Sequence, residues 1–540
     1  MRLTKENMQN DANSSYDVII VGGGHNGLVC GAYLAKAGKK VLVLERNKHV
    51  GGAAVTREII PGFRASTFSY LMSLLHPKII RELELERRGL RVLPAADMFT
   101  PLPGGDHLLF TGDDARNVKE FARFSEHDAR RYPAFKAYLD RIAAAARNLM
   151  LQTPIDPQDN SLRGMANLTA FVWENRKLVK EFYGLYDILT MSAYDFLSEW
   201  FESDIVKGVY AYYSGIGSFQ GPKTPGSAYI LLHHLMGEHE GAGGWGFIEG
   251  GMGKISETIA AAGTEYGMHI LTEAAVDHIE VRAGRASSVV CGDGREFHGR
   301  VVASNVSAKL LFTKMMNGAE LPEDFRWNVE TFRTESAAAK LNIACERLPR
   351  FTAFDPEICG FDYPSYTHVA PDVEYLEAAY ADAKQGWYSR KPFVTVTAPT
   401  TVDKTLAPAG KHVINLFCGH APYTLRGGAS WEDHRQKFAD QVLDALEEYA
   451  PGFREDIIAM QVLVPPDIER EIGSPNGHIF HGELSVDQLF FKRPAPHYAD
   501  YRTPIRGLYL CGSTTHPGGG VSGISGHNAA REIQKDWRRL

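Results

Sequence analysis

The sequence predicts an α/β fold of two domains, in which a domain built on a parallel sheet is assembled from three separate segments of the chain. Each segment carries a short apolar run typical of a buried strand, next to glycines and a stretch with helical spacing. The longer regions between them are rich in aromatic residues and predict an inserted α+β domain. The expected limits are 16–75, 243–309 and 496–540 for the first domain, 76–242 and 310–495 for the second, and 1–15 for a disordered tail.

Composition limits the classes of function. The chain has 540 residues, of which 44% are apolar and 23% charged, and its net charge of −7 gives no basic field for nucleic acid. Its six cysteines form no C-x-x-C pair, which indicates reduced thiols rather than a redox dithiol or a zinc cluster. No apolar run approaches the roughly 18 residues of a membrane-spanning helix. Residues 1–15 lack the apolar core of a secretory signal, so we expect none there. We expect a cytoplasmic protein and leave open a peripheral position at a membrane surface.

The first fifty residues contain the pattern strand, G-x-G-x-x-G, helix, strand, acid. In such a Rossmann-type unit Gly22 makes the tight turn, Gly24 leaves room for a pyrophosphate, and Gly27 lets the helix pack closely on the strand. The helix N-terminus offers free N–H groups to the phosphates, and the acid that ends the second strand binds the ribose hydroxyls. The pattern predicts a dinucleotide site that includes Gly22, Gly24, Asn26, Gly27 and Glu45.

A second glycine pair favours FAD over NAD. Arg46 follows the ribose acid, and Gly51, Gly52 and Ala53 come shortly afterwards. A glycine pair in this place resembles the second glycine motif of FAD enzymes of the glutathione-reductase-like superfamily, which amine oxidases and phytoene desaturases share. The resemblance implies FAD as the cofactor and adds these four residues to its site. Amine oxidases commonly carry Arg after the pair, so Ala53 places the chain further from that branch.

Two later segments complete the expected FAD domain. Between 243 and 309 a glycine-led helix, a strand and a hairpin follow one another, and in this superfamily the strand near Val276 lends its backbone to the adenine. Near the C-terminus an apolar run ends at Gly512, and three glycines then precede a helix. N–H groups at such a helix start suit the pyrimidine edge of a flavin, where negative charge builds on reduction. The expected flavin contacts are Gly512, Ser513, Gly519, Gly520 and Val521.

Taken together, the motifs resemble those of one family. The run 516–521 (His-Pro-Gly-Gly-Gly-Val) is similar to the C-terminal signature of bacterial phytoene desaturases. The runs 17–28, 51–56, 250–253 and 479–483 are more similar to the pyridine nucleotide-disulfide oxidoreductase domain-containing branch of the phytoene-dehydrogenase-like family. The resemblance covers nearly all of the chain after Tyr16. Many FAD relatives place an acid where Ser513 stands, so a weaker or water-mediated cofactor contact is expected there.

The resemblance implies an FAD-dependent oxidoreductase, a dehydrogenase or desaturase, acting on an apolar small molecule such as a polyene or isoprenoid. Hydride would pass to flavin N5, a neighbouring proton would leave, and oxygen, a quinone or another acceptor would reoxidise the flavin. Because the cofactor carries the difficult chemistry, no protein base is assigned. His516, beside the expected flavin loop, is the candidate catalytic group. No histidine pair has metal-ligand spacing beside an acid, so no metal site is predicted.

The second domain offers a binding region for an apolar molecule. Its many aromatic residues favour either plain core or a long tunnel. The amphipathic stretch 68–83 has two interpretations, a domain helix interrupted at Pro77 or a tunnel mouth that touches a membrane surface.

Three other functions stay open on sequence grounds. A redox-neutral isomerase or saturase of polyenes would use the same flavin site. A flavoprotein of low turnover would act through protein–protein interaction. A dehydrogenase that uses NAD(P) alone is disfavoured by the C-terminal glycine loop, because such an enzyme needs no second cofactor loop.

Overall fold

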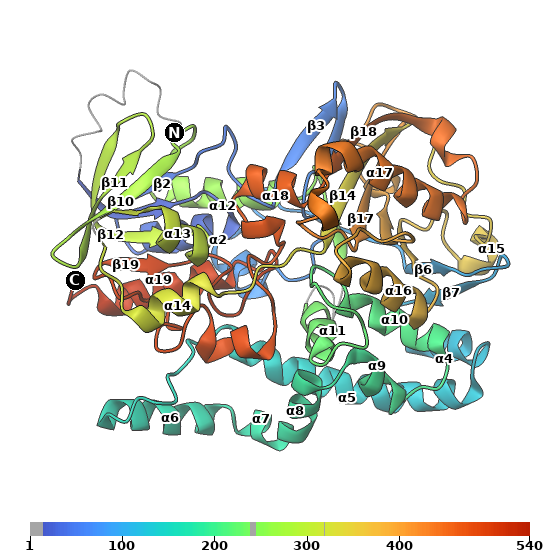
Figure 1. Cartoon of the computed structure of the whole chain (residues 1–540), viewed down its shortest axis with the longest axis horizontal. Coiled ribbons are helices and arrows are strands. Elements are labelled where there is room, and N and C mark those ends of the chain that lie inside the picture. The colour runs from blue at the N-terminus through green and yellow to red at the C-terminus, as the bar shows by residue number, and fades with distance from the viewer. Residues whose placement is uncertain (1–14, 238–244, 318) are drawn as a thin grey trace.

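The computed structural model describes residues 15–237, 245–317 and 319–540, and the chain folds into two lobes that lie side by side (Figure 1). Residues 1–14 of the expected tail lie outside the described residues, as do 243 and 244 at the start of the predicted second segment. In the orientation of Figure 1, the N-terminal and C-terminal strands lie in the left lobe, and a layer of helices runs along the lower edge.

A parallel sheet forms the centre of the first lobe. Its strands are, in order, β9 (His269–Leu271), β2 (Val41–Leu44), β1 (Tyr16–Val21), the C-terminal half of β12 (Glu296–Ser304) and β19 (Leu508–Leu510). Val18 lies opposite Val41 on one side and Val301 on the other, and all three are fully buried. Parallel strands covered on both faces need continuous apolar runs, which explains the lack of polar alternation in these segments.

Helices and an antiparallel extension complete the first lobe. Helix α2 (His25–Lys36) packs against both α12 (Gly253–Glu265) and α19 (Ile524–Asp536), so the helix of the first segment contacts those of the other two. The N-terminal half of β12 continues into an antiparallel meander with β11 (Arg285–Cys291) and β10 (Val276–Arg282), and β13 (Met316–Asn317) joins its edge. The predicted α/β fold is confirmed, while the limits of the domains stay a prediction.

The second lobe is built on a seven-stranded, mainly antiparallel sheet. Its strands are, in order, β18 (Ile457–Leu463), β14 (Ala338–Cys345), β17 (His412–Gly419), β16 (Phe393–Thr397), β15 (Tyr366–Val369), β6 (Met98–Pro101) and β7 (His107–Phe110). Helix α17 (Trp431–Glu447) contacts this sheet and shares its apolar core with Leu341 and Val394.

Shorter elements connect and cover the two large sheets. Two small sheets pair β3 (Thr56–Ile60) with β4 (Phe63–Ser66) and β5 (Val92–Pro94) with β8 (Gly246–Ile248). The other α-helices are α3 (Pro77–Glu82), α4 (Asp114–Ala122), α5 (Glu126–Met150), α6 (Leu162–Glu174), α7 (Arg176–Lys180), α8 (Phe182–Thr190), α9 (Ala193–Ser198), α10 (Asp204–Ser214), α11 (Ser227–Leu235), α13 (Ala308–Lys314), α14 (Glu323–Glu330), α15 (Pro356–Cys359), α16 (Val373–Lys384) and α18 (Pro465–Ile472).

The stretch 68–83 turns inward rather than toward solvent. Helix α3 begins at Pro77, with His76 as its N-cap, because proline is favoured in the first turn of a helix. Before Pro77 the chain is not helical, and Leu71, Met72 and Leu75 are buried. The interpretation as a helix interrupted at Pro77 is therefore wrong. A membrane-touching mouth at this stretch stays a prediction.

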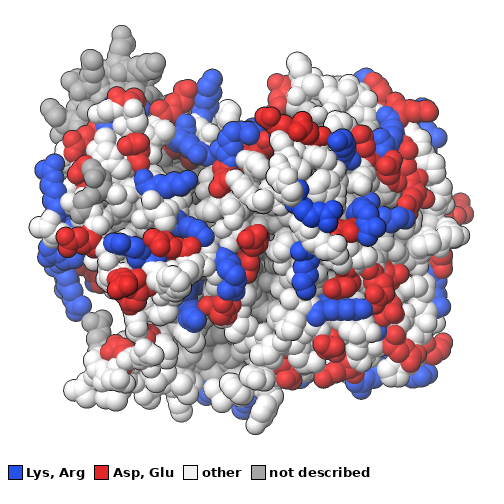
Figure 2. Space-filling view, in the orientation of Figure 1, with Lys and Arg blue, Asp and Glu red and all other residues white. Residues whose placement is uncertain are grey.

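Charged residues are spread over the surface. On the face drawn in Figure 2, Lys and Arg side chains alternate with Asp and Glu, without a continuous basic stripe. Among the residues that the structure describes, no helix combines the length and the apolar character needed to pass through a bilayer.

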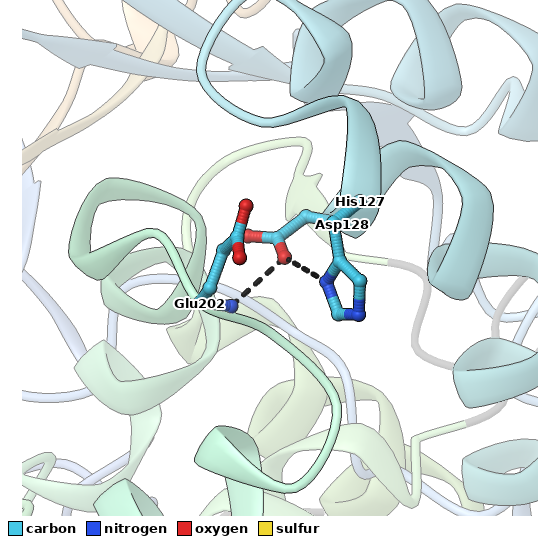
Figure 3. A group of neighbouring side chains, drawn as sticks. All are labelled: His127, Asp128 and Glu202. Atoms are coloured by element: carbon cyan, nitrogen blue, oxygen red, sulfur yellow. Dashed lines mark hydrogen bonds and ion pairs between the residues drawn. The ribbon is translucent and has the colours of Figure 1, made fainter.

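A buried carboxylate ties the long helix α5 to the turn before α10. The oxygens of Asp128 accept hydrogen bonds from the backbone N–H groups of Glu202 and Ser203 at 2.8 and 2.9 Å. His127 also lies near it, so three side chains with metal-ligating atoms gather here (Figure 3). Because the Asp128 oxygens already accept from backbone donors and the Glu202 carboxylate accepts from Ser125, the group is explained as a structural tie.

Replacing this carboxylate tests the tie. Asp128→Ala leaves two buried N–H groups unpaired, and we expect it to lower the free energy of unfolding by about 3 kcal/mol. Asp140→Ala, on the same helix, removes only a half-exposed ion pair with Lys136, and the expected change is below about 0.5 kcal/mol. Urea denaturation of both variants measures the difference. Equal losses, or a melting temperature that depends on added zinc, would contradict the structural role.

Candidate active site

A cleft of about 330 Å³ lies at the carboxyl ends of β1 and β2, the edge where parallel sheets bind ligands. It is lined by residues from all three predicted segments of the first domain. Of the predicted cofactor residues, the structure places nine in its wall: Gly22, Gly24, Asn26, Glu45, Arg46, Gly52, Ala53, Val276 and Ser513. Segments that are far apart in the sequence therefore meet in one place.

Glu45 has the position expected of the ribose-binding acid. One of its oxygens accepts from the N–H of Gly23 at 2.8 Å, and the other accepts from the backbone and side-chain amides of Asn47 at 2.8 and 3.0 Å. These bonds hold the carboxylate at the cleft wall and leave lone pairs for ribose hydroxyls. The neighbouring Arg46 donates to the carbonyl of Arg470 at 2.8 Å, which joins the cleft to α18.

A hydrogen bond joins the first and last segments across the cleft. Asn26 Nδ2 donates to Ser513 Oγ at 3.3 Å. The Oδ1 atom of Asn26 is buried and has no hydrogen-bond partner in the described part of the chain. Because unpaired buried acceptors are rare, this atom suits a donor from a bound ligand. With the N–H groups at the start of α2, the cleft fits the phosphate-bearing half of FAD.

Asn305 lines the same cleft, although no sequence pattern singled it out as a site residue. It follows β12, and its Nδ2 would lie 2.6 Å from a Cβ atom at position 24. Gly24 is therefore required by Asn305 as well as by the expected pyrophosphate. The only signal in the sequence was an asparagine directly after an apolar strand.

Five predicted glycines lie outside the wall of the cleft, and four of them have packing roles. A Cβ atom at Gly27 would lie 2.3 Å from the carbonyl oxygen of Gly22, in line with the close helix packing expected there. A Cβ atom would likewise lie within 3 Å of a backbone atom at the other three: 2.4 Å at Gly51, 2.5 Å at Gly512 and 2.3 Å at Gly519. Their lack of a side chain shapes the turns around the site.

An apolar cavity of about 140 Å³ adjoins the cleft. The two share part of their wall, because His25, Ala53, Ile472, His481 and Ser513 line both. The predicted flavin contacts Gly520 and Val521 line this cavity too. No Asp or Glu from the described residues lines it, and its wall is mainly aromatic and aliphatic: Phe68, Tyr70, Leu71, Leu74, Ile216, Trp245, Phe417, Ile468, Ile479 and Phe480.

Two neutral histidines mark the junction of cleft and cavity. His25 Nε2 donates to the carbonyl of Gly520 at 3.2 Å, and burial lowers the pKa of His25 to about 4. His481 has a left-handed φ of 58°, and its buried Nδ1 has no hydrogen-bond partner within the described ranges. Burial lowers the pKa of His481 to about 4 as well. Both rings therefore offer hydrogen bonds without a charge at neutral pH.

His516, the candidate catalytic group, lines neither the cleft nor the cavity. Its Nε2 donates to the carbonyl of Leu149 at 2.8 Å, and its own carbonyl accepts from Tyr501 at 2.8 Å. Burial lowers the pKa of His516 to about 4. This placement argues against the expected catalytic role and indicates that His516 holds the flavin loop in position.

A buried lysine lines the apolar cavity instead. Lys340 lies in β14, its Nζ donates to the carbonyl of Ser66, and the same atom lies 5.3 Å from the centre of the Tyr70 ring. No carboxylate forms an ion pair with it in the described structure, and burial holds its pKa well below the ordinary value. Burial thus favours the unprotonated amine, which can accept a proton. In the sequence, Lys340 could have been noticed only as the one charged residue in the mostly apolar run 337–344.

Behind Ser513 lies a fully buried arginine. Burial lowers the pKa of Arg493 to about 10, so the guanidinium stays charged at neutral pH. Among the described residues no carboxylate pairs with it. A buried charge without a counter-charge is costly, so Arg493 suits a site where negative charge develops. It donates only to backbone carbonyls, those of Phe480, Gly482, Glu483, Gln488 and Ser513.

Two of the six cysteines meet in the first lobe. Cys30 in α2 and Cys511 after β19 are both buried, and their thiols are within hydrogen-bonding contact. Burial, and then the contact with Cys30, raises the pKa of Cys511 well above its ordinary value. Because the thiolate is the reactive form, this pair lacks the character of a redox dithiol.

Known proteins share this architecture. Residues 20–83 match the family described as NAD(P)-binding Rossmann-like domain. A solved oxidoreductase from Methanosarcina mazei has a TM-score of 0.57 at 16% identity and covers 96% of this chain and 100% of its own. Putrescine oxidase bound to putrescine has a TM-score of 0.58 at 15% identity, covering 98% and 100%. These likenesses show the fold.

Sequence relatives extend over nearly the whole chain. Pyridine nucleotide-disulfide oxidoreductase domain-containing protein 2 of Rattus norvegicus is 40% identical, over 97% of this chain and 94% of that protein. A limonene dehydrogenase component of Castellaniella defragrans is 26% identical, covering 96% and 94%. The lycopene-forming phytoene desaturase of Pseudescherichia vulneris is 25% identical, covering 94% and 96%.

The unpaired charge of Arg493 predicts a redox effect. We expect Arg493→Gln to lower the two-electron midpoint potential of bound flavin by at least about 30 mV, a tenfold change in equilibrium. Arg493→Lys keeps the charge and should stay near the wild-type potential. Arg333→Gln removes an arginine that is already paired with Glu483 and Asp487, and it serves as the control. Spectroelectrochemistry measures all three, and a potential unchanged in flavin-loaded Arg493→Gln would contradict the prediction.

Proposed function

Since the chain belongs to the family of pyridine nucleotide-disulfide oxidoreductase domain-containing protein 2 and is an FAD-dependent oxidoreductase, we propose that it dehydrogenates an uncharged, apolar substrate. Isoprenoid hydrocarbons are the substrate class that fits best. One observation carries the proposal: the cofactor cleft shares a wall with an apolar cavity whose described lining holds no carboxylate.

The charge of the cavity favours a neutral substrate over an amine. A cationic amine would find no carboxylate to pair with in the described wall of the cavity, and the guanidinium of Arg493 lies behind Ser513 of that wall. An apolar molecule gains free energy there by leaving water. A cavity of about 140 Å³ holds a compact hydrocarbon or one end of a longer chain. The relatives named for limonene and phytoene, both isoprenoid hydrocarbons, support this substrate class.

The chain's residues have distinct tasks in this reaction. FAD, once bound, supplies the hydride acceptor. The aromatic wall orients the substrate and excludes water, which strengthens every polar interaction inside. Lys340, whose unprotonated form burial favours, takes the proton that leaves the neighbouring carbon. Arg493 and the N–H groups of the C-terminal glycine loop stabilise the negative charge that reduction creates.

Anaerobic mixing tests the substrate class. We expect limonene, a cyclic monoterpene hydrocarbon, to bleach the flavin absorbance in a stopped-flow experiment, because the cavity accepts neutral apolar molecules. Putrescine should leave the absorbance unchanged, because its charges have no partner in the cavity. Bleaching by putrescine and not by the hydrocarbon would overturn the proposal. Rearranged hydrocarbon product, formed with no net flavin reduction, would favour the redox-neutral isomerase.

The pH dependence tests Lys340. Because burial lowers its pKa below the ordinary 10.5, the rate of flavin reduction should rise with pH as the amine loses its proton, and level off below pH 10.5. Lys340→Met should reduce the rate about 100-fold and remove the rising limb. Lys207→Met replaces a buried lysine that pairs with Asp204 outside the cavity, and it should behave as wild type. A wild-type rate and pH profile in Lys340→Met would exclude Lys340 as the proton acceptor.

A further inference from the structure

Exposed apolar side chains are concentrated in one short region. In the described part of the chain, nine of the fifteen large apolar side chains that are exposed lie between 162 and 186, on helices α6, α7 and α8. The most exposed are Leu162 at 85%, Tyr183 at 81% and Trp173 at 71%. Monomeric proteins rarely expose apolar residues in so dense a cluster. Such a surface is typical of a site that contacts another protein or a membrane.

Helix α6 is exposed around most of its circumference. Leu162, Met165, Leu168 and Val172 are all exposed, although their helical spacing is that of a face that packs against something. In Figure 1 the helices α6, α7 and α8 form the lower edge of the molecule, apart from both sheets. Figure 2 shows the left part of the lower edge in the same view as largely uncharged, whereas charged side chains cover the right part. We call this region, residues 162–186, the lower helical surface.

Positive charge lies in the middle of the lower helical surface. Arg176, Lys177 and Lys180 are exposed on α7, between the apolar helices α6 and α8. None of the three forms an ion pair with an acid among the described residues, and Arg176 lies over the ring of Trp173 at 5.3 Å. Basic residues flanked by Trp, Tyr and Leu are typical of helices that lie in a membrane interface.

The lower helical surface is one helix away from the substrate cavity. Helix α8 packs against α11, and His234 of α11 lines the cavity. Burial lowers the pKa of His234 to about 4, so this wall stays neutral and apolar. An apolar molecule dissolved in a bilayer would therefore need to pass a single layer of helices to reach the site.

We propose that the lower helical surface docks the enzyme on a lipid bilayer with anionic headgroups. The apolar side chains of α6 and α8 enter the interface, and the cations of α7 pair with lipid phosphates. Unpaired cations and interfacial aromatic residues favour lipid over a second copy of the chain. The supply of substrate from the bilayer rests on the proposed function, whereas the docking itself does not.

Vesicle co-sedimentation of the FAD-loaded protein tests the docking. The probes are vesicles of phosphatidylcholine alone and of phosphatidylcholine mixed with phosphatidylglycerol. We expect binding to the mixed vesicles that weakens with added salt. Binding should weaken at least about tenfold in each of two variants. One combines Trp173→Glu with Tyr183→Glu, and the other combines Arg176→Glu, Lys177→Glu and Lys180→Glu. Trp327→Glu replaces an equally exposed tryptophan on α14, at 66%, and should bind as wild type.

Three results of the vesicle experiment would overturn the docking proposal. They are failure of the wild type to bind the mixed vesicles, equal binding to neutral vesicles, and full binding by the Trp173 and Tyr183 variant. Light scattering that shows an oligomer, dissociated by that same variant, would make the surface an interface between copies of the chain instead. The substituted side chains are exposed, so the flavin content should stay that of the wild type. Vesicle binding without hydrocarbon oxidation would contradict the proposed function alone.

Discussion

The meeting of the N-terminal and C-terminal segments around β12 is the constraint on which the site depends. Strand β12 pairs with β1 on one side and with β19 on the other, which brings the two glycine-rich turns to the same edge of the sheet. The hydrogen bond from Asn26 to Ser513 then joins these turns at the point where the cleft and the apolar cavity meet. A dinucleotide needs backbone N–H groups at its phosphates and a separate support at its ring, and this pairing supplies both.

Burial determines the chemistry of that place. Because charged forms are costly away from water, His25 and His481 are neutral and Lys340 is shifted toward its neutral form. Arg493 keeps its charge, since a guanidinium loses its proton only at high pH even when buried. The site thus combines one fixed positive charge with neutral polar groups and an apolar wall. This combination suits an uncharged substrate and a cofactor that becomes negative on reduction.

Most residues of the predicted cofactor site lie together in one cleft, and the sequence could single them out because its signals are local. A strand, a glycine turn and an acid at fixed spacing determine where Gly22, Gly24 and Glu45 lie, and the continuous apolar runs revealed the parallel strands. The substrate half depends on contacts between distant segments. Lys340 and Arg493 gain their roles only from the residues that surround them, and neither lies in a motif. The proximity of Cys30 and Cys511 is likewise invisible in a pattern, since the pair arises when α2 and β19 pack in the same lobe.

Whether the cleft and the cavity form one flavin site can be decided from the cofactor that the protein carries. The measurement is the visible absorbance spectrum of the purified protein, followed by chromatography of the cofactor released on denaturation. We expect a flavin spectrum and FAD in stoichiometric amount with the chain. A protein that binds no flavin even after incubation with FAD, or that releases NAD(P) in its place, would contradict this expectation. The glycine loop beside Ser513 would then be a structural turn without a cofactor.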